Sequence, residues 1–77
     1  MFISVRITLF GALRRQVGKQ HLALTLKQGA TVADALLACG LEDRVDIWAL
    51  VNGQRTQRHV ALDDGDQISF FQPVGGG

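Results

Sequence analysis

Apolar and polar residues alternate in two stretches near the start of the chain. Between positions 3 and 9 every second residue is Ile, Val or Leu, and the residues in between are Ser4, Arg6 and Thr8. Between positions 22 and 26 the even positions are all leucine. Because side chains of a β-strand point alternately to its two faces, both stretches are predicted to be half-buried strands. Residues 11–18, with a glycine at each end, are predicted to form a loop with a short helical turn, so that the two strands make a hairpin.

The middle of the chain carries the signals of one short helix. Thr31 and Asp34 have the spacing of a capping box, in which each side chain bonds the backbone N–H of the other residue. Gly40 stands where a left-handed residue often ends a helix. The apolar stripe between these two ends consists of Val32, Ala35, Leu36 and Cys39.

Turn signals divide the rest of the chain into further strands. Residues 47–51 are an apolar run that ends at Asn52-Gly53, the dipeptide that best tolerates the positive φ angles of a tight turn. Asp and Gly residues at 63–66 are a second turn signal, and residues 67–74 are predicted to be the last strand.

The predicted order is therefore strand, strand, helix, strand, a short extended piece and strand. This order favours an α+β fold of the β-grasp type, with a mixed sheet of four to five strands and one main helix packed on one face. The N-terminal and C-terminal strands are expected side by side at the centre of the sheet. With 77 residues, the chain has room for a single core, and we predict one domain over 1–73 followed by a flexible glycine tail over 74–77.

Composition narrows the classes of function. The apolar fraction of 47% suits a folded globule, and a formal charge of +1 gives no electrostatic case for binding nucleic acid. Residues 1–6 form a short apolar stretch that is cut by Arg6, unlike a signal peptide or a membrane span. A cytoplasmic protein without membrane contact is therefore expected.

No catalytic or metal-binding constellation stands out along the chain. Cys39 is the only cysteine, which excludes an internal disulfide, and its apolar neighbours predict a buried, unreactive thiol. His21 and His59 are isolated from each other and from metal-ligand spacings, and both are expected on strand surfaces. The sequence thus predicts a domain without a catalytic constellation of its own, which does not favour an enzyme.

The C-terminal tail is the strongest candidate for chemistry. Pro73 and Val74 are followed by Gly75, Gly76 and Gly77. Glycine has no Cβ, so such a tail is able to thread a channel too narrow for other residues. At about 3.3 Å for each extended residue, it would reach roughly 15 Å beyond the fold and carry its terminal carboxylate into a partner's catalytic centre. The alternative is a frayed, inert end.

Strand parity predicts a second functional feature near this tail. If the odd positions of the first strand face the helix, Phe2 and Phe10 point to the opposite face of the sheet. By the same argument, Phe70 belongs to the core and Phe71 to the opposite face. A single helix covers only one face, so Phe10 and Phe71 are predicted to form a patch that binds a partner. The alternative is that they are scattered exposed aromatics, which are normal on protein surfaces.

The chain resembles the MoaD/ThiS sulfur carriers along nearly its whole length. The most specific similarity is an Asp-Gly-Asp turn, an apolar strand, a Pro-Val step and a diglycine, all at the C-terminus. The segments that carry the resemblance are 7–14, 31–36, 51–53 and 62–76. It implies a ubiquitin-like fold whose terminal glycine is adenylated by a MoeB/ThiF-like enzyme and then converted to a thiocarboxylate. The sulfur would pass to a synthase subunit that is MoaE-like or thiazole-synthase-like.

The resemblance also implies roles for individual residues. Gly76 and Gly77 would be the reactive end, and Gly75 would fill the variable position of a Pro-Val-x-Gly-Gly ending; alternatively, Gly77 is an extra residue. ATP and magnesium would be used by the activating enzyme, with no cofactor bound by the carrier. The partner-binding residues would be Phe10, Arg14, Phe71, Pro73, Val74 and Gly75.

Three functions remain open at this point. The pairs Phe70-Phe71 and Pro73-Val74 favour the small, non-catalytic subunit of a molybdopterin synthase over a carrier of the thiamine pathway. A ubiquitin-like modifier, which forms isopeptide bonds, would use the same activation chemistry. A third candidate is an interaction module with an unreactive tail.

Overall fold

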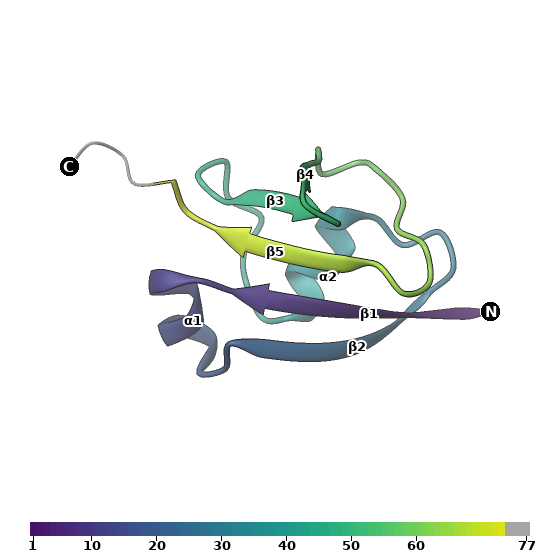
Figure 1. The fold of residues 1–77 in the computed structure, drawn as a ribbon, viewed down its shortest axis with the longest axis horizontal. Coiled ribbons are helices and arrows are strands. Elements are labelled where there is room, and N and C mark those ends of the chain that lie inside the picture. The colour runs from purple at the N-terminus through teal and green to yellow at the C-terminus, as the bar shows by residue number, and fades with distance from the viewer. Residues whose placement is uncertain (74–77) are drawn as a thin grey trace.

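The computed structural model describes residues 1–73, which form a five-stranded mixed sheet with two helices (Figure 1). The elements are β1 (Phe2–Leu9), α1 (Gly11–Val17), β2 (His21–Lys27), α2 (Val32–Ala38), β3 (Trp48–Val51), β4 (Gln54–Arg55) and β5 (Gln67–Phe71). The strands lie in the order β2-β1-β5-β3-β4, and β1 and β5 are parallel neighbours at the centre. The predicted β-grasp fold is confirmed. The predicted domain boundary after residue 73 stays a prediction, because residues 74–77 lie outside the described part of the chain.

The N-terminal strands pair as their alternation predicts. β1 and β2 are antiparallel, with Val5 opposite Leu24, and the odd positions of β1 are buried while most even positions are exposed. The connection is more regular than a loop, since residues 11–17 form the complete helix α1. This helix ends at Gly18, whose φ of 88° is in the left-handed region and whose N–H donates to the carbonyl of Arg14.

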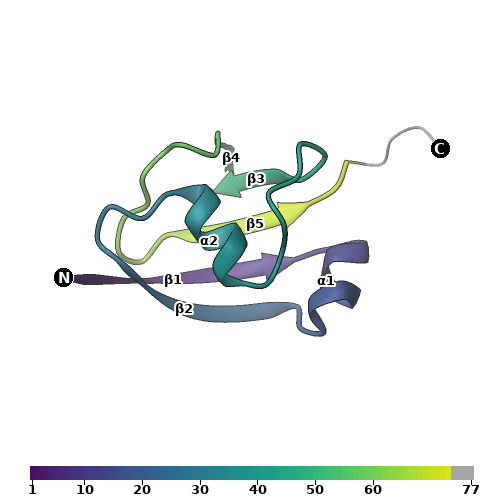
Figure 2. The same cartoon turned by 180° about the vertical axis from the view of Figure 1, so that it is seen from behind.

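Helix α2 crosses one face of the sheet (Figure 2). The predicted capping box is present: the Asp34 carboxylate accepts from the N–H of Thr31 at 2.9 Å, and the Thr31 hydroxyl accepts from the N–H of Asp34 at 3.3 Å. Gly40 follows the helix with a φ of 95°, as its position predicts. The buried side of α2 consists of Val32, Ala35 and Leu36, so the apolar stripe faces the sheet.

Two predicted strands are longer than the strands in the structure. β3 begins at Trp48 and not at residue 47, because Ile47 belongs to a turn in which its N–H donates to the carbonyl of Arg44. β5 ends at Phe71 and not at residue 74. Its neighbour β1 stops at Leu9, where the chain turns into α1, and Pro73 has no N–H with which to extend a ladder.

The remaining turn and surface predictions are mostly confirmed. Asn52 and Gly53, with φ angles of 52° and 86°, form the tight turn between β3 and β4. His21 is exposed at the start of β2, as expected, whereas His59 lies in a turn and not on a strand. No helix within residues 1–73 is long and apolar enough to cross a membrane. The cytoplasmic location stays a prediction.

The core lies between α2 and the inner face of the sheet. Phe70 of β5 is fully buried there, with Leu9 beside it on β1. Cys39 is also buried, as predicted, and its thiol donates to the carbonyl of Leu36 at 3.1 Å. Burial raises the pKa of this thiol, because the thiolate would lose its hydration. Cys39 is therefore a packing residue and a poor nucleophile.

Candidate functional site at the base of the tail

The two predicted surface phenylalanines lie at the end of the sheet where the tail leaves. Figure 1 looks onto the sheet face opposite α2, and neither of the two helices within residues 1–73 covers that face. Phe10 is 45% exposed, and its N–H donates to the carbonyl of Phe70 at 3.3 Å, which places it beside β5. Phe71 is half-buried, whereas its neighbour Phe70 is fully buried. The predicted parity of these residues is therefore confirmed, while their role in binding stays a prediction.

Trp48 completes an aromatic surface that the sequence prediction omitted. It is paired with Phe71 across the β3–β5 ladder, and the two rings have centroids 6.0 Å apart at an angle of 59°. The guanidinium carbon of Arg55 on β4 lies 3.4 Å from the centroid of the Trp48 ring, in a cation–π contact. We call Phe10, Trp48, Arg55 and Phe71 the tail-base patch. The alternation of side chains along β3 would have predicted this position of Trp48. Ala49 is a core residue, so its neighbour Trp48 has to point to the opposite face of the sheet.

Arg14 lies at the same end of the sheet as the tail-base patch but is not one of its residues. It is exposed on α1, which begins immediately after Phe10 and carries the basic pair Arg14 and Arg15 in its last turn. Figure 1 shows α1 at the end of the sheet from which the C-terminal strand leaves. Arg14 and Arg15 on α1 and Arg55 in the patch are all exposed basic residues.

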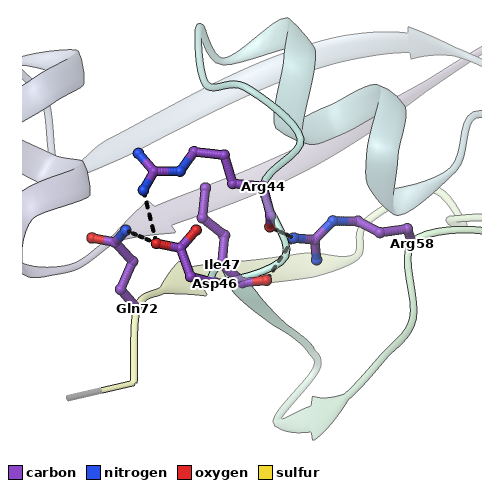
Figure 3. A network of polar contacts seen from close by, with 5 residues as sticks. All are labelled: Arg44, Asp46, Ile47, Arg58 and Gln72. Atoms are coloured by element: carbon purple, nitrogen blue, oxygen red, sulfur yellow. Dashed lines mark hydrogen bonds and ion pairs between the residues drawn. The ribbon is translucent and has the colours of Figure 1, made fainter. Parts of the chain in front are cut away.

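A polar network holds the residue that precedes Pro73 (Figure 3). The Gln72 side-chain amide donates to Oδ2 of Asp46 at 2.8 Å, and Arg44 donates to the same oxygen at 2.9 Å. Asp46 and Arg44 belong to the loop between α2 and β3. This loop is bonded in turn by Arg58, whose guanidinium donates to the main-chain carbonyls of Arg44 and Ile47.

The other predicted site residues fall at or beyond the limit of the described chain. Pro73 is half-buried and is the last described residue. Val74, Gly75, Gly76 and Gly77 lie outside the described residues, so their predicted roles stay predictions. In the part from 1 to 73, no three His, Cys, Asp or Glu side chains are grouped so that they could hold a metal ion.

The geometry defines a class of protein. The sheet is mixed, with parallel β1 and β5 at its centre. Helix α2 covers one face, and the other face carries aromatic residues beside the point where the C-terminal segment leaves. This arrangement is that of a ubiquitin-like β-grasp domain. Comparison of the sequence with known families then identifies a particular one: the sequence model of the ThiS family matches residues 7–77. The chain belongs to the ThiS family, which confirms the predicted resemblance to MoaD/ThiS proteins.

Individual relatives agree with this assignment. Small archaeal modifier protein 3 of Haloferax volcanii is 30% identical over an alignment of 92 residues, covering 97% of this chain and 100% of that protein. The crystal structure of small archaeal modifier protein 1 from the same organism has a TM-score of 0.78 at 28% identity, over 96% of this chain and 99% of the other. A putative molybdopterin converting factor subunit 1 of Pyrococcus furiosus has a TM-score of 0.80 at 24% identity, over 94% and 99% of the two chains, and shows a shared fold. The family is one of small ubiquitin-like carriers and modifiers, not of enzymes.

Proposed function

We propose that this protein is a sulfur carrier whose terminal glycine, Gly77, is adenylated and then converted to a thiocarboxylate. The observation that carries the proposal is the position of the tail-base patch. Only Gln72, Pro73 and Val74 separate the triglycine end from β5 in the sequence, and Phe71, in the last position of that strand, belongs to the patch. A partner that binds the patch would therefore receive the start of the tail at its own surface.

The chemistry requires a partner enzyme. A carboxylate is a poor electrophile, and joining it to AMP supplies a leaving group that a persulfide sulfur displaces. The first step releases pyrophosphate, and the second releases AMP and leaves the glycine as an acyl disulfide. A second thiol of the partner then cleaves the S–S bond, so that a disulfide forms on the partner and the glycine is released as a thiocarboxylate. ATP and magnesium would be bound by a MoeB/ThiF-like activating enzyme, while this chain supplies the docking surface and the substrate group.

The patch has the features of a docking surface. Aromatic and arginine side chains are enriched at the centres of protein interfaces, and Trp48 contacts both the ring of Phe71 and the guanidinium of Arg55. The exposed arginines of the patch and of α1 favour a partner surface with acidic residues around an apolar centre. Phe10, Arg14 and Pro73 would lie at the border of this interface.

Two destinations for the activated glycine have specific support. The pairs Phe70-Phe71 and Pro73-Val74 favour the small subunit of a molybdopterin synthase, with a MoaE-like acceptor, over a thiazole-synthase-like acceptor. A second candidate function, a ubiquitin-like modifier that forms isopeptide bonds with lysines, is favoured by the relatives of 28–30% identity, which are named small archaeal modifier proteins. Both functions begin with the same adenylation.

Intact mass spectrometry separates these functions. The full chain is incubated with a MoeB/ThiF-like enzyme from the same genome, ATP, magnesium, a persulfide donor and a thiol reductant that cleaves the acyl disulfide. A gain of about 16 Da would mark exchange of a carboxylate oxygen for sulfur, and a gain of a whole protein mass would mark conjugation. An unchanged mass, with no exchange of pyrophosphate into ATP, would contradict both and leave an interaction module with an unreactive tail.

A further inference from the structure

We propose that Gln72 and Asp46 are positioning residues that fix the direction in which the tail leaves the domain. This inference rests on the proposed function, because it concerns how the reactive glycine is presented to the activating enzyme. It assigns a role to the loop between α2 and β3, which lies far from the tail in sequence and contributes no residue to the tail-base patch.

The side chain of Gln72 holds the chain where the sheet no longer does. The ladder of β5 ends with the pairs Leu9–Phe70 and Trp48–Phe71, so Gln72 follows the last paired residue. Its side-chain amide bonds Asp46 at 2.8 Å. In addition, the ring of Pro73 restricts the backbone of the residue before it to extended conformations. Gln72 is thus constrained both through its backbone and through its side chain.

Asp46 is itself a fixed anchor. Arg44 donates to the same carboxylate oxygen at 2.9 Å, and charge-assisted bonds of this kind are the stronger ones. The surrounding loop is tied down by Arg58, whose side chain is only 25% exposed and which also donates to Asp43 at 2.7 Å. Figure 3 shows the resulting chain of contacts from Arg58 through the loop to Gln72.

This arrangement separates two steps of activation. The patch residues Phe10, Trp48 and Phe71 bind the partner, whereas the Gln72–Asp46 bond orients the chain beyond them. A tail that leaves in a fixed direction loses less conformational entropy when it enters the partner's channel. Loss of the bond should therefore lower the rate of adenylation at saturating carrier and leave the strength of docking nearly unchanged.

The test is a double-mutant cycle in pyrophosphate exchange with the activating enzyme and the full chain as substrate. Gln72→Met keeps the length of the side chain and removes its donor, and Asp46→Ala removes the acceptor. We expect each change to lower kcat about fivefold with KM altered less than about twofold, and the double variant to be no slower than either single one. Asp46→Asn retains an acceptor and should restore most of the rate. Gln67→Met, the same substitution at the other end of β5, is the matched control.

A second measurement examines the contact without the enzyme. In a ¹⁵N–¹H spectrum, Asp46→Ala should shift the side-chain amide signals of Gln72 and leave those of Gln67 in place. Additive effects in the cycle, a rise in KM at unchanged kcat, or unmoved Gln72 signals would each overturn the positioning role. Failure of the unaltered chain to support any exchange would instead refute the proposed function, so the two failures are distinguishable.

Discussion

The neighbouring residues Phe70 and Phe71 allow the core and the docking surface to be tested with the same chemical change. Phe70 is fully buried on the central strand β5, and truncation of a buried phenylalanine costs about 3–5 kcal/mol of folding free energy. A domain of 77 residues has a total stability of only about 4–12 kcal/mol. Phe70→Ala should therefore remove a large part of the stability and leave a partly unfolded protein at 37 °C.

Phe71→Ala should cost much less in folding and more in binding. Its side chain is half-buried and packs mainly against Trp48, at a centroid distance of 6.0 Å. Half of the area term of a phenylalanine plus one aromatic pair amounts to about 1–3 kcal/mol of folding free energy. Loss of a central aromatic residue from an interface costs about 1–3 kcal/mol of binding free energy, which is about a 5- to 150-fold weaker complex.

Thermal melts and a binding titration with the activating enzyme measure both quantities on the same variants. For a domain of this size, each kcal/mol shifts Tm by about 4–8 °C, so a difference of about 2 kcal/mol, taken from the midpoints of the two ranges, should separate the alanine variants by about 8–16 °C. Phe10→Ala, at an exposed position, serves as a second surface variant with little effect on Tm. The parity argument is refuted if Phe71→Ala unfolds the domain as badly as Phe70→Ala. The docking argument is refuted if neither Phe10→Ala nor Phe71→Ala weakens the complex.

Three further results are expected. Deletion of Gly77 should abolish pyrophosphate exchange without changing Tm, because the tail then ends one residue short of the partner's nucleotide. Full exchange by the truncated chain would exclude Gly77 as the reactive residue. Gly76→Ala should slow exchange severely if the partner's channel excludes a methyl group. In urea unfolding, Leu24→Pro should destabilise the domain by at least about 3 kcal/mol, whereas Thr25→Pro should be tolerated. The hydrogen bonds of Gln28 with Met1 and of Gln20 with Leu9 indicate that the backbone N–H groups at even positions of β2 bond β1, while those at odd positions face solvent. Cys39, with its raised pKa, should react with iodoacetamide at pH 8 far more slowly than a free cysteine, and alkylation at the free rate in folded protein would contradict its burial.

The sequence was sufficient for the fold because its local signals agree with one another. Alternation in β1, the capping box at Thr31 and the Asn52-Gly53 turn each specify a conformation within a few residues, and the structure contains all three. The pattern is less informative about where a strand ends. β5 stops at Phe71 because its neighbour β1 ends at Leu9, and a strand's own residues do not record the length of its partner.

The sequence predicted the candidate site only at residues whose place in the alternation of a strand decides which face of the sheet they occupy. Phe10 and Phe71 follow from the alternation of their own strands, and Trp48 would have followed from the same rule applied to β3. By contrast, the bond between Gln72 and Asp46 joins residues 26 positions apart and depends on the path of an irregular loop. Periodicity and turn signals do not specify such a contact.

The position of β5 suits it to carry the reactive tail of the proposed function. As a central strand it is bonded on both sides, by β1 and by β3, so its end is among the best-anchored points of the chain. Its last residue, Phe71, is part of the patch, and the next, Gln72, is bonded to a loop that Arg58 ties down. If the proposed roles are correct, two consecutive residues, Phe71 and Gln72, contribute to docking and to the direction of the tail. A carrier that must release one partner and present the same glycine to another needs this arrangement, because each partner then finds the tail in the same place relative to the surface that it binds.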